Sequence, residues 1–291
     1  MFQYLAILFA YKTLSWIPTP LAYVIADFLG TVMYYARGSV RRNVQRNMRQ
    51  VMGPDADPKQ VRAAARSVLR NSTRYYADLI HGPRLDINRF FNKRVKLFFD
   101  VEYIREAMAA RRGVIITSGH YGNPEIVAQS AVAVGIKAFS LTEPLQPQRF
   151  NDFVHKLRSV HGQVFSPLSF STMKEAIRIL QEGERVVPIL CDRAIGNSGK
   201  MLPFFGAETL MPVGPAQLAL RTNALVIPMF CRRVGNNFEV YAEPPMEMIR
   251  TGDEEEDVRV NSLRIIACIE KFVKDDPGQW IVLESLWDKS R

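Results

Sequence analysis

The sequence predicts an α/β fold with a mostly parallel central sheet flanked by helices, preceded by an apolar helical hairpin. From about residue 90 onwards, short runs rich in β-branched and aromatic residues alternate with helical segments, an order typical of a sheet covered by helices. The chain has 291 residues, of which 47% are hydrophobic and 23% charged, so it can bury a large core.

The first 36 residues form the most apolar part of the chain. Lys12, Asp27 and the Pro18/Pro20 pair divide it into pieces shorter than the ~18 uncharged residues that a spanning helix needs. The basic start and the small-residue cleavage site of a signal peptide are also missing. We expect two short helices joined at "IPTP", forming a hairpin (1–40) that lies in a membrane surface or dips into one leaflet. The alternative is a helical pair packed on the main domain (41–291).

The net charge of +9 calls for an anionic partner such as anionic lipid or an acidic carrier protein. Six basic residues against Asp27 give residues 1–50 a charge of +5, so most of the excess lies beside the apolar segment. This placement favours a membrane surface over nucleic acid. The three cysteines lie in apolar contexts without metal-binding spacing, which indicates reduced core residues in a cytoplasmic-facing domain.

The main domain is predicted element by element. "SVRRNVQRNMRQVMG" is typical of a basic amphipathic helix ended by Gly53, and the next helix runs to Gly82 and Pro83. Strands are expected at 112–119, 136–141, 162–167, 184–192, 224–232 and 237–243. Helices are expected at 123–135, 147–162, 170–183, 214–223 and 258–280, the last after an acidic, solvated connection at 252–257.

The junction "VIITSGHYGNPE" (114–125) lies where a strand is expected to end and a helix to begin, the place where reactive groups collect in an open α/β sheet. Gly119 and Gly122 allow the backbone to turn, His120 stands at the carboxyl end of a strand, and Pro124 suits the first turn of a helix. We expect Glu125 to fold back onto His120 and fix its tautomer, which leaves the other ring nitrogen as a base for a hydroxyl proton.

Other catalytic templates are missing from the sequence. There is no G-x-S-x-G, no H-E-x-x-H and no nucleophilic cysteine signature, and "AIGNSGKM" lacks the glycine spacing of a P-loop. The nucleophile is therefore expected to come from the substrate, with no metal ion and no cofactor.

The H-x-x-x-x-E pair at a strand end resembles the glycerolipid acyltransferase superfamily. Further blocks follow in order: "RRNVQRNM", "GHYGNPE", "LTEPLQPQRFNDFVHKLRSVHG", "VPILCDRAIGNSGKMLPFFG", "MPVGPAQLALRTNALVIPMF" and "DPGQWIVLESLWDKSR". With them the chain resembles the lipid A biosynthesis acyltransferase family, which includes phosphatidylinositol mannoside acyltransferases. Glu125 stands where aspartate is commoner in the family, and "VLESLW" lacks the family's aromatic and histidine-rich ending, which leaves the acceptor open.

The resemblance implies transfer of a fatty acyl chain from acyl-CoA or acyl carrier protein to a hydroxyl of a glycolipid, of the lipid A precursor or phosphatidylinositol mannoside type. It implies His120 and Glu125 as the catalytic pair and a place at the cytoplasmic face of the inner membrane, monotopic or peripheral. Lysophospholipid acyltransferase, thioesterase or hydrolase activity and a non-catalytic lipid-binding module are the alternatives.

Further blocks of the resemblance supply candidate substrate-binding residues. Arg158 and Arg193 either bind a phosphate of donor or acceptor, or pair with Glu143 and Asp192 and hold the walls of the site. Phe205, next to Phe204, either lines an acyl channel or belongs to the core. The other candidates are Gly206 and Gly214, the latter opening a helix expected to line the pocket.

Overall fold

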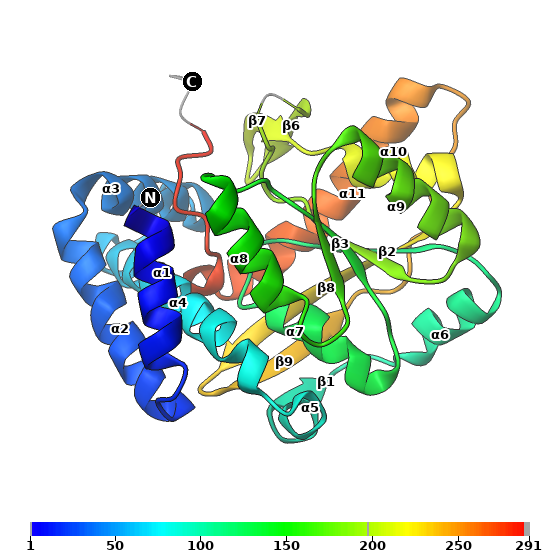
Figure 1. The fold of residues 1–291 in the computed structure, drawn as a ribbon. Coiled ribbons are helices and arrows are strands. Elements are labelled where there is room, and N and C mark those ends of the chain that lie inside the picture. Colours follow the sequence, from blue (N-terminus) through cyan, green and yellow to red (C-terminus); the bar gives the residue numbers. More distant parts are fainter. Residues whose placement is uncertain (1, 197, 288–291) are drawn as a thin grey trace.

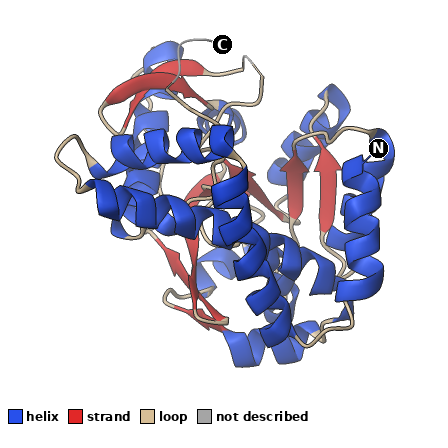
Figure 2. Ribbon diagram, turned by 90° about the vertical axis from the view of Figure 1, so that its left-hand side faces the viewer, coloured by secondary structure: helices blue, strands red, loops and turns tan. Residues whose placement is uncertain are grey.

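The structure, a computed structural model, describes residues 2–196 and 198–287. It places a layer of helices beside an α/β domain (Figure 1). The helical layer contains α1 (Phe2–Leu14), α2 (Thr19–Ala36), α3 (Gly38–Met52) and α4 (Pro58–His81). In Figure 2, viewed from the side of this layer, helices cross in front of the strands. The helix boundaries at Gly53 and Gly82 are confirmed.

The central sheet has the strand order β1-β9-β8-β2-β5. β2 (Val114–Ser118) lies between β5 (Val186–Leu190) and β8 (Leu225–Val234), and both pairings are parallel. β9 (Asn237–Ala242) returns antiparallel to β8 through a tight turn, and β1 (Val95–Leu97) joins β9 in parallel. β3 (Phe139–Thr142) and β4 (Val164–Pro167) form a parallel pair that approaches β5 through a bridge between Ala138 and Val186. All six predicted strands are confirmed.

Helices connect these strands and cover the sheet. The structure gives α5 (Ile87–Arg94), α6 (Glu102–Ala109), α7 (Pro124–Ser130), α8 (Gln148–Arg158), α9 (Phe170–Glu182), α10 (Gly214–Thr222) and α11 (Glu254–Asp275), with short 3₁₀ turns η1 (Gly82–Arg84), η2 (Ala131–Val134) and η3 (Pro277–Gln279). The hairpin β6 (Lys200–Phe204) and β7 (Ala207–Met211), like β1, α5 and α6, was not predicted.

The prediction that residues 252–257 form a solvated connection is wrong, because α11 already begins at Glu254. Asp253 caps this helix by accepting hydrogen bonds from the N–H groups of Glu255 and Glu256 at 2.9 and 3.3 Å. Carboxylates in a first helical turn are stabilised by the helix dipole, so the acidic run starts a helix instead of linking two elements.

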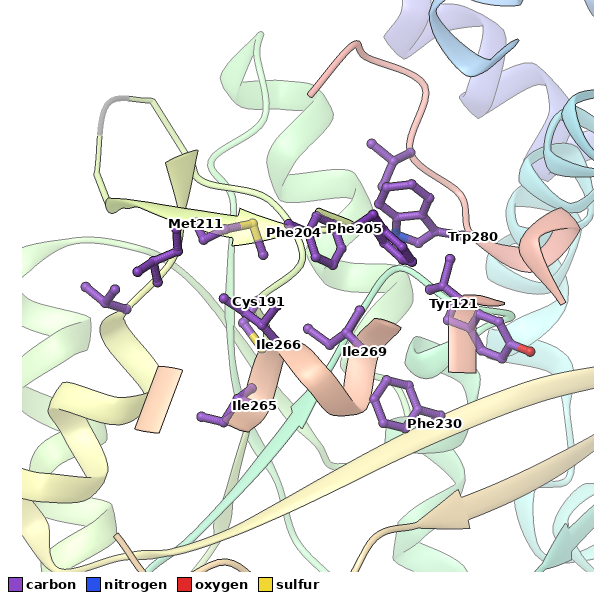
Figure 3. Packing of buried hydrophobic residues seen from close by; sticks show 14 of the residues in the cluster. Tyr121, Cys191, Phe204, Phe205, Met211, Phe230, Ile265, Ile266, Ile269 and Trp280 are labelled. Atoms are coloured by element: carbon purple, nitrogen blue, oxygen red, sulfur yellow. The ribbon is translucent and has the colours of Figure 1, made fainter. Parts of the chain in front are cut away.

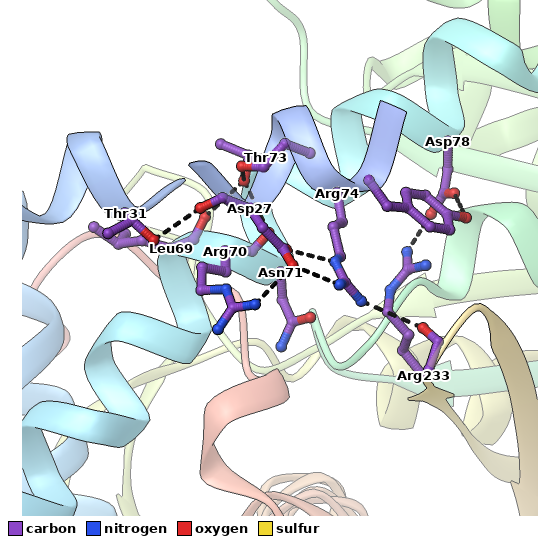
Figure 4. A network of polar contacts seen from close by, with 12 residues as sticks. Asp27, Thr31, Leu69, Arg70, Asn71, Thr73, Arg74, Asp78 and Arg233 are labelled. Atoms are coloured by element: carbon purple, nitrogen blue, oxygen red, sulfur yellow. Dashed lines mark hydrogen bonds and ion pairs between the residues drawn. The ribbon is translucent and has the colours of Figure 1, made fainter. Parts of the chain in front are cut away.

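A network of polar side chains connects helices of the helical layer with one another and with the sheet (Figure 4). Asp27 on α2 pairs with Arg70 and Arg74 on α4, each at 2.6 Å. Further along α4, the buried carboxylate of Asp78 pairs with buried Arg233 on β8. Because removing one partner of a buried ion pair is costly, the Asp78–Arg233 pair fixes α4 against the sheet, and the Asp27 pairs join α2 to α4.

The predicted break at "IPTP" is confirmed, since α1 ends at Leu14 and α2 begins at Thr19. One face of α2 packs closely on α4, and a Cβ at Gly30 would lie 2.6 Å from Arg70 Cα. Among the described residues, no helix is long and apolar enough to cross a membrane. The membrane association of the hairpin therefore stays a prediction. The opposite side of the hairpin exposes large apolar residues, namely Phe9, Trp16, Leu21, Val24, Phe28, Val32 and Tyr35.

Candidate active site

The turn between β2 and α7 is held by its own sequence and by β8. Asn123 caps α7 by accepting a hydrogen bond from the Ile126 N–H at 3.1 Å, and Pro124 occupies the first turn. Gly122 has φ +63°, and a Cβ there would lie 1.8 Å from the carbonyl oxygen of Cys231. Only glycine fits this approach, so the turn rests directly on β8.

His120 is held by Asp192, the second residue after the neighbouring strand β5. Nδ1 of His120 lies 2.7 Å from Asp192 Oδ1, and the His120 backbone N–H donates to Oδ2 at 2.8 Å. The carboxyl ends of parallel strands meet at one sheet edge, which brings the two residues together. The predicted partner of the imidazole was Glu125, and the structure corrects it to Asp192.

Asp192 is enclosed, whereas the imidazole is partly open. The side chain of Asp192 is 0% exposed and that of His120 is 30% exposed. Trp280 Nε1 donates a third hydrogen bond to the carboxylate, at 2.7 Å. Burial raises the pKa of Asp192, but the charge and hydrogen bonds of His120 and the Trp280 hydrogen bond outweigh it and hold that pKa below its usual value. An ionised Asp192 accepts from Nδ1–H, which leaves the Nε2 lone pair for chemistry.

The C-terminal segment backs this pair. The Ile281 N–H donates to the His120 carbonyl at 2.7 Å, and the Gly122 N–H donates to the Gln279 carbonyl at 2.9 Å. Trp280 is fully buried beside Phe204 and Phe205 in the core (Figure 3). Sequence reasoning gave Trp280 no role, although it lies within the "DPGQW" block. The Gly122 N–H is taken up by Gln279, so it is not a donor for a reaction intermediate.

Glu125 belongs to a separate cluster. Its Oε2 lies 2.9 Å from Arg158 Nε and 2.8 Å from Arg158 Nη2, and Tyr75 donates its hydroxyl hydrogen to the same oxygen. The side chains of Arg158 and Glu125 are only 14% and 10% exposed. Burial lowers the pKa of Arg158, but the charge of Glu125 and the interaction of Arg158 with Tyr75 outweigh burial and raise this pKa overall. Arg158 is thus committed to Glu125, not to Glu143, and the cluster ties α7 to α8 and α4.

The sequence left two alternatives for Arg193, binding a phosphate or pairing with acidic side chains, and in the structure Arg193 pairs with acidic side chains. It contacts Glu143, just after β3, and its Nη1 lies 3.4 Å from Glu284 Oε1. Arg193 follows Asp192 directly, so this group lies beside the His120 site. No cluster of His, Cys, Asp and Glu side chains suited to a metal ion occurs within residues 2–196 and 198–287.

The remaining candidates shape the structure around the site. Phe205 and Gly206 form the turn of the β6–β7 hairpin with φ of 50° and 76°, and Phe205 is buried in the core. The core interpretation of Phe205 is therefore the one that the structure supports. Gly214 begins α10, but this helix does not contribute to the apolar cavity described next, contrary to the expectation that it lines the pocket.

An apolar cavity opens beside His120 on one face of the sheet. It encloses about 780 Å³ of empty space, counting its open mouth. Ser118 and Leu190, each two residues before a member of the His120–Asp192 pair, line it together with Pro124 at the start of α7. The remaining lining is almost entirely apolar and comes from the sheet, α7, η2 and the segment from α5 to α6. An elongated apolar group could therefore lie along the sheet with its polar end near the imidazole.

Comparison with known proteins gives a consistent result. The profile of the bacterial lipid A biosynthesis acyltransferases matches residues 1–289. A phosphatidylinositol mannoside acyltransferase of Mycobacterium tuberculosis strain H37Rv is 25% identical over 266 residues, covering 87% of this chain and 79% of the relative. The enzyme of the same name from Mycolicibacterium smegmatis is 26% identical over 260 residues, covering 87% and 82%.

Proposed function

Because the chain belongs to the bacterial lipid A biosynthesis acyltransferase family and is an acyltransferase, we propose that it transfers a fatty acyl chain from acyl-CoA or acyl carrier protein to a glycolipid hydroxyl. The names of the relatives favour an acceptor of the phosphatidylinositol mannoside type over a lipid A precursor. The observation that carries the mechanism is the 2.7 Å contact between His120 Nδ1 and Asp192.

His120 is the general base of this reaction. Asp192 fixes the tautomer through Nδ1–H, and Nε2 accepts the proton of the acceptor hydroxyl as its oxygen attacks the thioester carbonyl carbon. The tetrahedral intermediate collapses with cleavage of the C–S bond, and the imidazolium returns its proton to the departing thiolate. An ester and a free thiol result, so the balance needs no further reactant.

Glu125 is a positioning residue in this mechanism. Its carboxylate is taken up by Arg158 and Tyr75, so it fixes α7, and with it the turn that carries His120, without touching the imidazole. Arg193 is the better candidate for a donor or acceptor phosphate, because it directly follows Asp192 in the chain and its side chain is less enclosed than that of Arg158.

The apolar cavity is assigned to the acyl chain of the donor. Its lining includes Ser118, Pro124 and Leu190, which are close in sequence to the His120–Asp192 pair, and it offers few polar groups. A thioester carbonyl at this end of the cavity would lie near Nε2 while the chain is buried along the sheet. Burial of each methylene stabilises the bound donor by about 0.8 kcal/mol.

The exposed side of the α1–α2 hairpin is assigned to an anionic membrane surface at the cytoplasmic face of the inner membrane. Trp16 is 74% exposed, and the Arg84 guanidinium stands over its ring at 3.4 Å. An aromatic ring with a neighbouring cation suits the headgroup region of a bilayer. Arg41 and Arg42 on α3 extend the basic surface beside the hairpin.

The decisive experiment is acyl transfer from radiolabelled palmitoyl-CoA into the lipid extract of the host, with detergent-purified enzyme. We expect His120→Ala to lower the rate by roughly 10²–10⁴-fold. His161→Ala, which changes a histidine bonded to the Gly82 carbonyl at 2.8 Å, is the matched control. Full activity of His120→Ala would refute the mechanism.

Two further arms of the assay separate the alternatives. Free fatty acid released equally fast with and without acceptor would indicate a thioesterase, and preferred labelling of a lysophospholipid would indicate a lysophospholipid acyltransferase. For the membrane surface, flotation with anionic vesicles should be lost in Phe9→Ser/Phe28→Ser and kept in Phe170→Ser, which alters an exposed phenylalanine on α9. Equal flotation of both variants would contradict this assignment.

A further inference from the structure

A second cavity lies on the same face of the sheet as the apolar cavity beside His120. Its lining surrounds about 650 Å³ of space, part of which is open to solvent. The lining comes from the β1–α6 connection, the start of α6, β8, the end of β9 and the segment that follows β9. None of the residues discussed for the catalytic step lines it. We call the cavity beside His120 the acyl cavity and the other one the distal cavity.

The two cavities are contiguous along the strands. On β8, Met229 lines the acyl cavity and Ile227 lines the distal cavity. On β9, Val240 lines the acyl cavity and Ala242 lines the distal cavity. Residues two apart on a strand point to the same face and are about 7 Å apart. On each strand, an advance of two residues therefore leads from the lining of one cavity to the lining of the other.

Two side chains, Phe99 and Ile104, line both cavities. Ile104 on α6 is buried in a cluster with Val114, Val186 and Leu225, which stand at the beginnings of β2, β5 and β8. The other end of β2, at Ser118, is four residue steps or about 13 Å from Val114, and His120 follows it by two residues. Ile104 thus stands near the beginnings of these strands, whereas Phe99 follows Leu97, which pairs with Val240 on β9. Together the two side chains form a wall that closes the acyl cavity on the side that faces the distal cavity.

Phe99 is the removable part of this wall. It lies in the connection between β1 and α6, outside any helix or strand, and is only partly buried. Ile104, in contrast, is 3% exposed and belongs to the core. Truncating Phe99 therefore opens a passage at small cost to the fold, whereas truncating Ile104 would also weaken the core.

We propose that Phe99, backed by Ile104, is the specificity-determining wall that limits the length of the acyl chain which this enzyme transfers. The proposal rests on the assignment of the acyl cavity to the donor chain. With Phe99 in place the terminal methyl group stops at the wall, and longer chains fit poorly. Without it the chain end extends into the distal cavity between Ile227 and Ala242.

The test measures kcat/KM for lauroyl-, myristoyl-, palmitoyl-, stearoyl- and arachidoyl-CoA with wild-type enzyme and Phe99→Ala. For donors longer than the wild-type optimum, we expect Phe99→Ala to raise kcat/KM by about tenfold or more. The reason is that one methylene in an apolar pocket changes kcat/KM by roughly 10–200-fold. Phe99→Leu, a smaller change, is expected to shift the ratio in the same direction if Phe99→Ala fails to fold.

Two matched variants test the path of the chain. Phe98→Ala removes a neighbouring aromatic that lines only the distal cavity, and it should keep the wild-type profile. Adding Ala242→Phe to Phe99→Ala fills the distal cavity and should restore the wild-type preference. A purely structural role of Phe99 would not give this reversal.

The variant Ala128→Leu, which narrows the acyl cavity alone, distinguishes a failure of the wall proposal from a failure of the acyl-cavity assignment. If it shifts the preference to shorter donors while the Phe99 variants keep the wild-type profile, the acyl cavity is correctly assigned and the wall proposal is wrong. If neither Ala128→Leu nor the Phe99 variants change the profile, the assignment of the acyl cavity is wrong and the wall proposal fails with it.

Discussion

The His120–Asp192 pair and the Glu125–Arg158 pair flank the same short turn but are built for different tasks. Asp192 is fully enclosed, and its imidazole partner remains 30% exposed, so one ring nitrogen is fixed while the ring stays partly open to solvent. In the second pair both side chains are at most 14% exposed, and Tyr75 adds a further hydrogen bond to the carboxylate. The first arrangement suits proton transfer, and the second suits holding helices together.

The difference shows that, at this sheet edge, the side chain that pairs with His120 is determined by which strand lies beside β2 more than by its distance from His120 along the sequence. Glu125 is five residues from His120, yet its helix directs it toward α8 and α4. Asp192 is 72 residues away in sequence, but β5 runs parallel to β2 and ends beside it. Four predictions test this division of labour.

The largest effect is expected from Asp192→Asn. The amide can donate to Nδ1 and stabilise the wrong tautomer of His120, and such a change in an Asp–His pair lowers kcat by up to about 10⁴-fold. Steady-state kinetics at several pH values with the purified variant measure it. An unchanged kcat and pH profile would mean that Asp192 is only a packing residue.

Glu125→Gln is expected to act mainly on stability. It leaves the buried Arg158 charge without its carboxylate, which costs about 3–5 kcal/mol and should be visible in thermal denaturation. The double variant Glu125→Gln/Arg158→Met should regain most of this loss. The comparison breaks down if Glu125→Gln, assayed below its unfolding temperature, loses as much kcat as Asp192→Asn.

Trp280→Phe should have an intermediate effect. It keeps most of the packing against Phe204 and Phe205 but removes the 2.7 Å hydrogen bond to Asp192. A hydrogen bond to a charged group contributes about 1.5–3 kcal/mol, so the free energy of unfolding should fall by this amount. The loss of kcat should be smaller than in Asp192→Asn, and the reverse order would place Trp280 in the reaction itself.

The smallest effect is confined to acid. Because the folded-state pKa of Asp192 is lowered, its ionisation stabilises the fold above the ordinary carboxyl value of about 3.9, and this contribution is lost as pH falls through the folded-state pKa. The difference in unfolding free energy between wild type and Asp192→Asn should narrow below about pH 4. Chemical denaturation across this range measures it, and a widening difference would contradict the lowered pKa.

The alternation of strand and helix patterns was enough to predict the six strands, the helix ends at Gly53 and Gly82, and His120 at the end of β2. The β6–β7 hairpin was missed because "KMLPFFGAETLM" carries no regular period-2 pattern, and its turn is made by Phe205 together with Gly206. The start of α11 was missed because an acidic run is polar in any conformation, whereas the structure shows it as the first turn of a helix capped by Asp253.

By itself, the sequence determined the α/β class, the family resemblance and the residue types at the catalytic turn, because periodicity, glycine positions and motif order are local properties. Only the tertiary structure decided that Asp192 holds His120, that Trp280 holds Asp192, and that Phe99 stands between two cavities. Each of these contacts joins segments far apart in sequence, and strand order and sheet register bring them together. No local pattern records which strand will lie beside which.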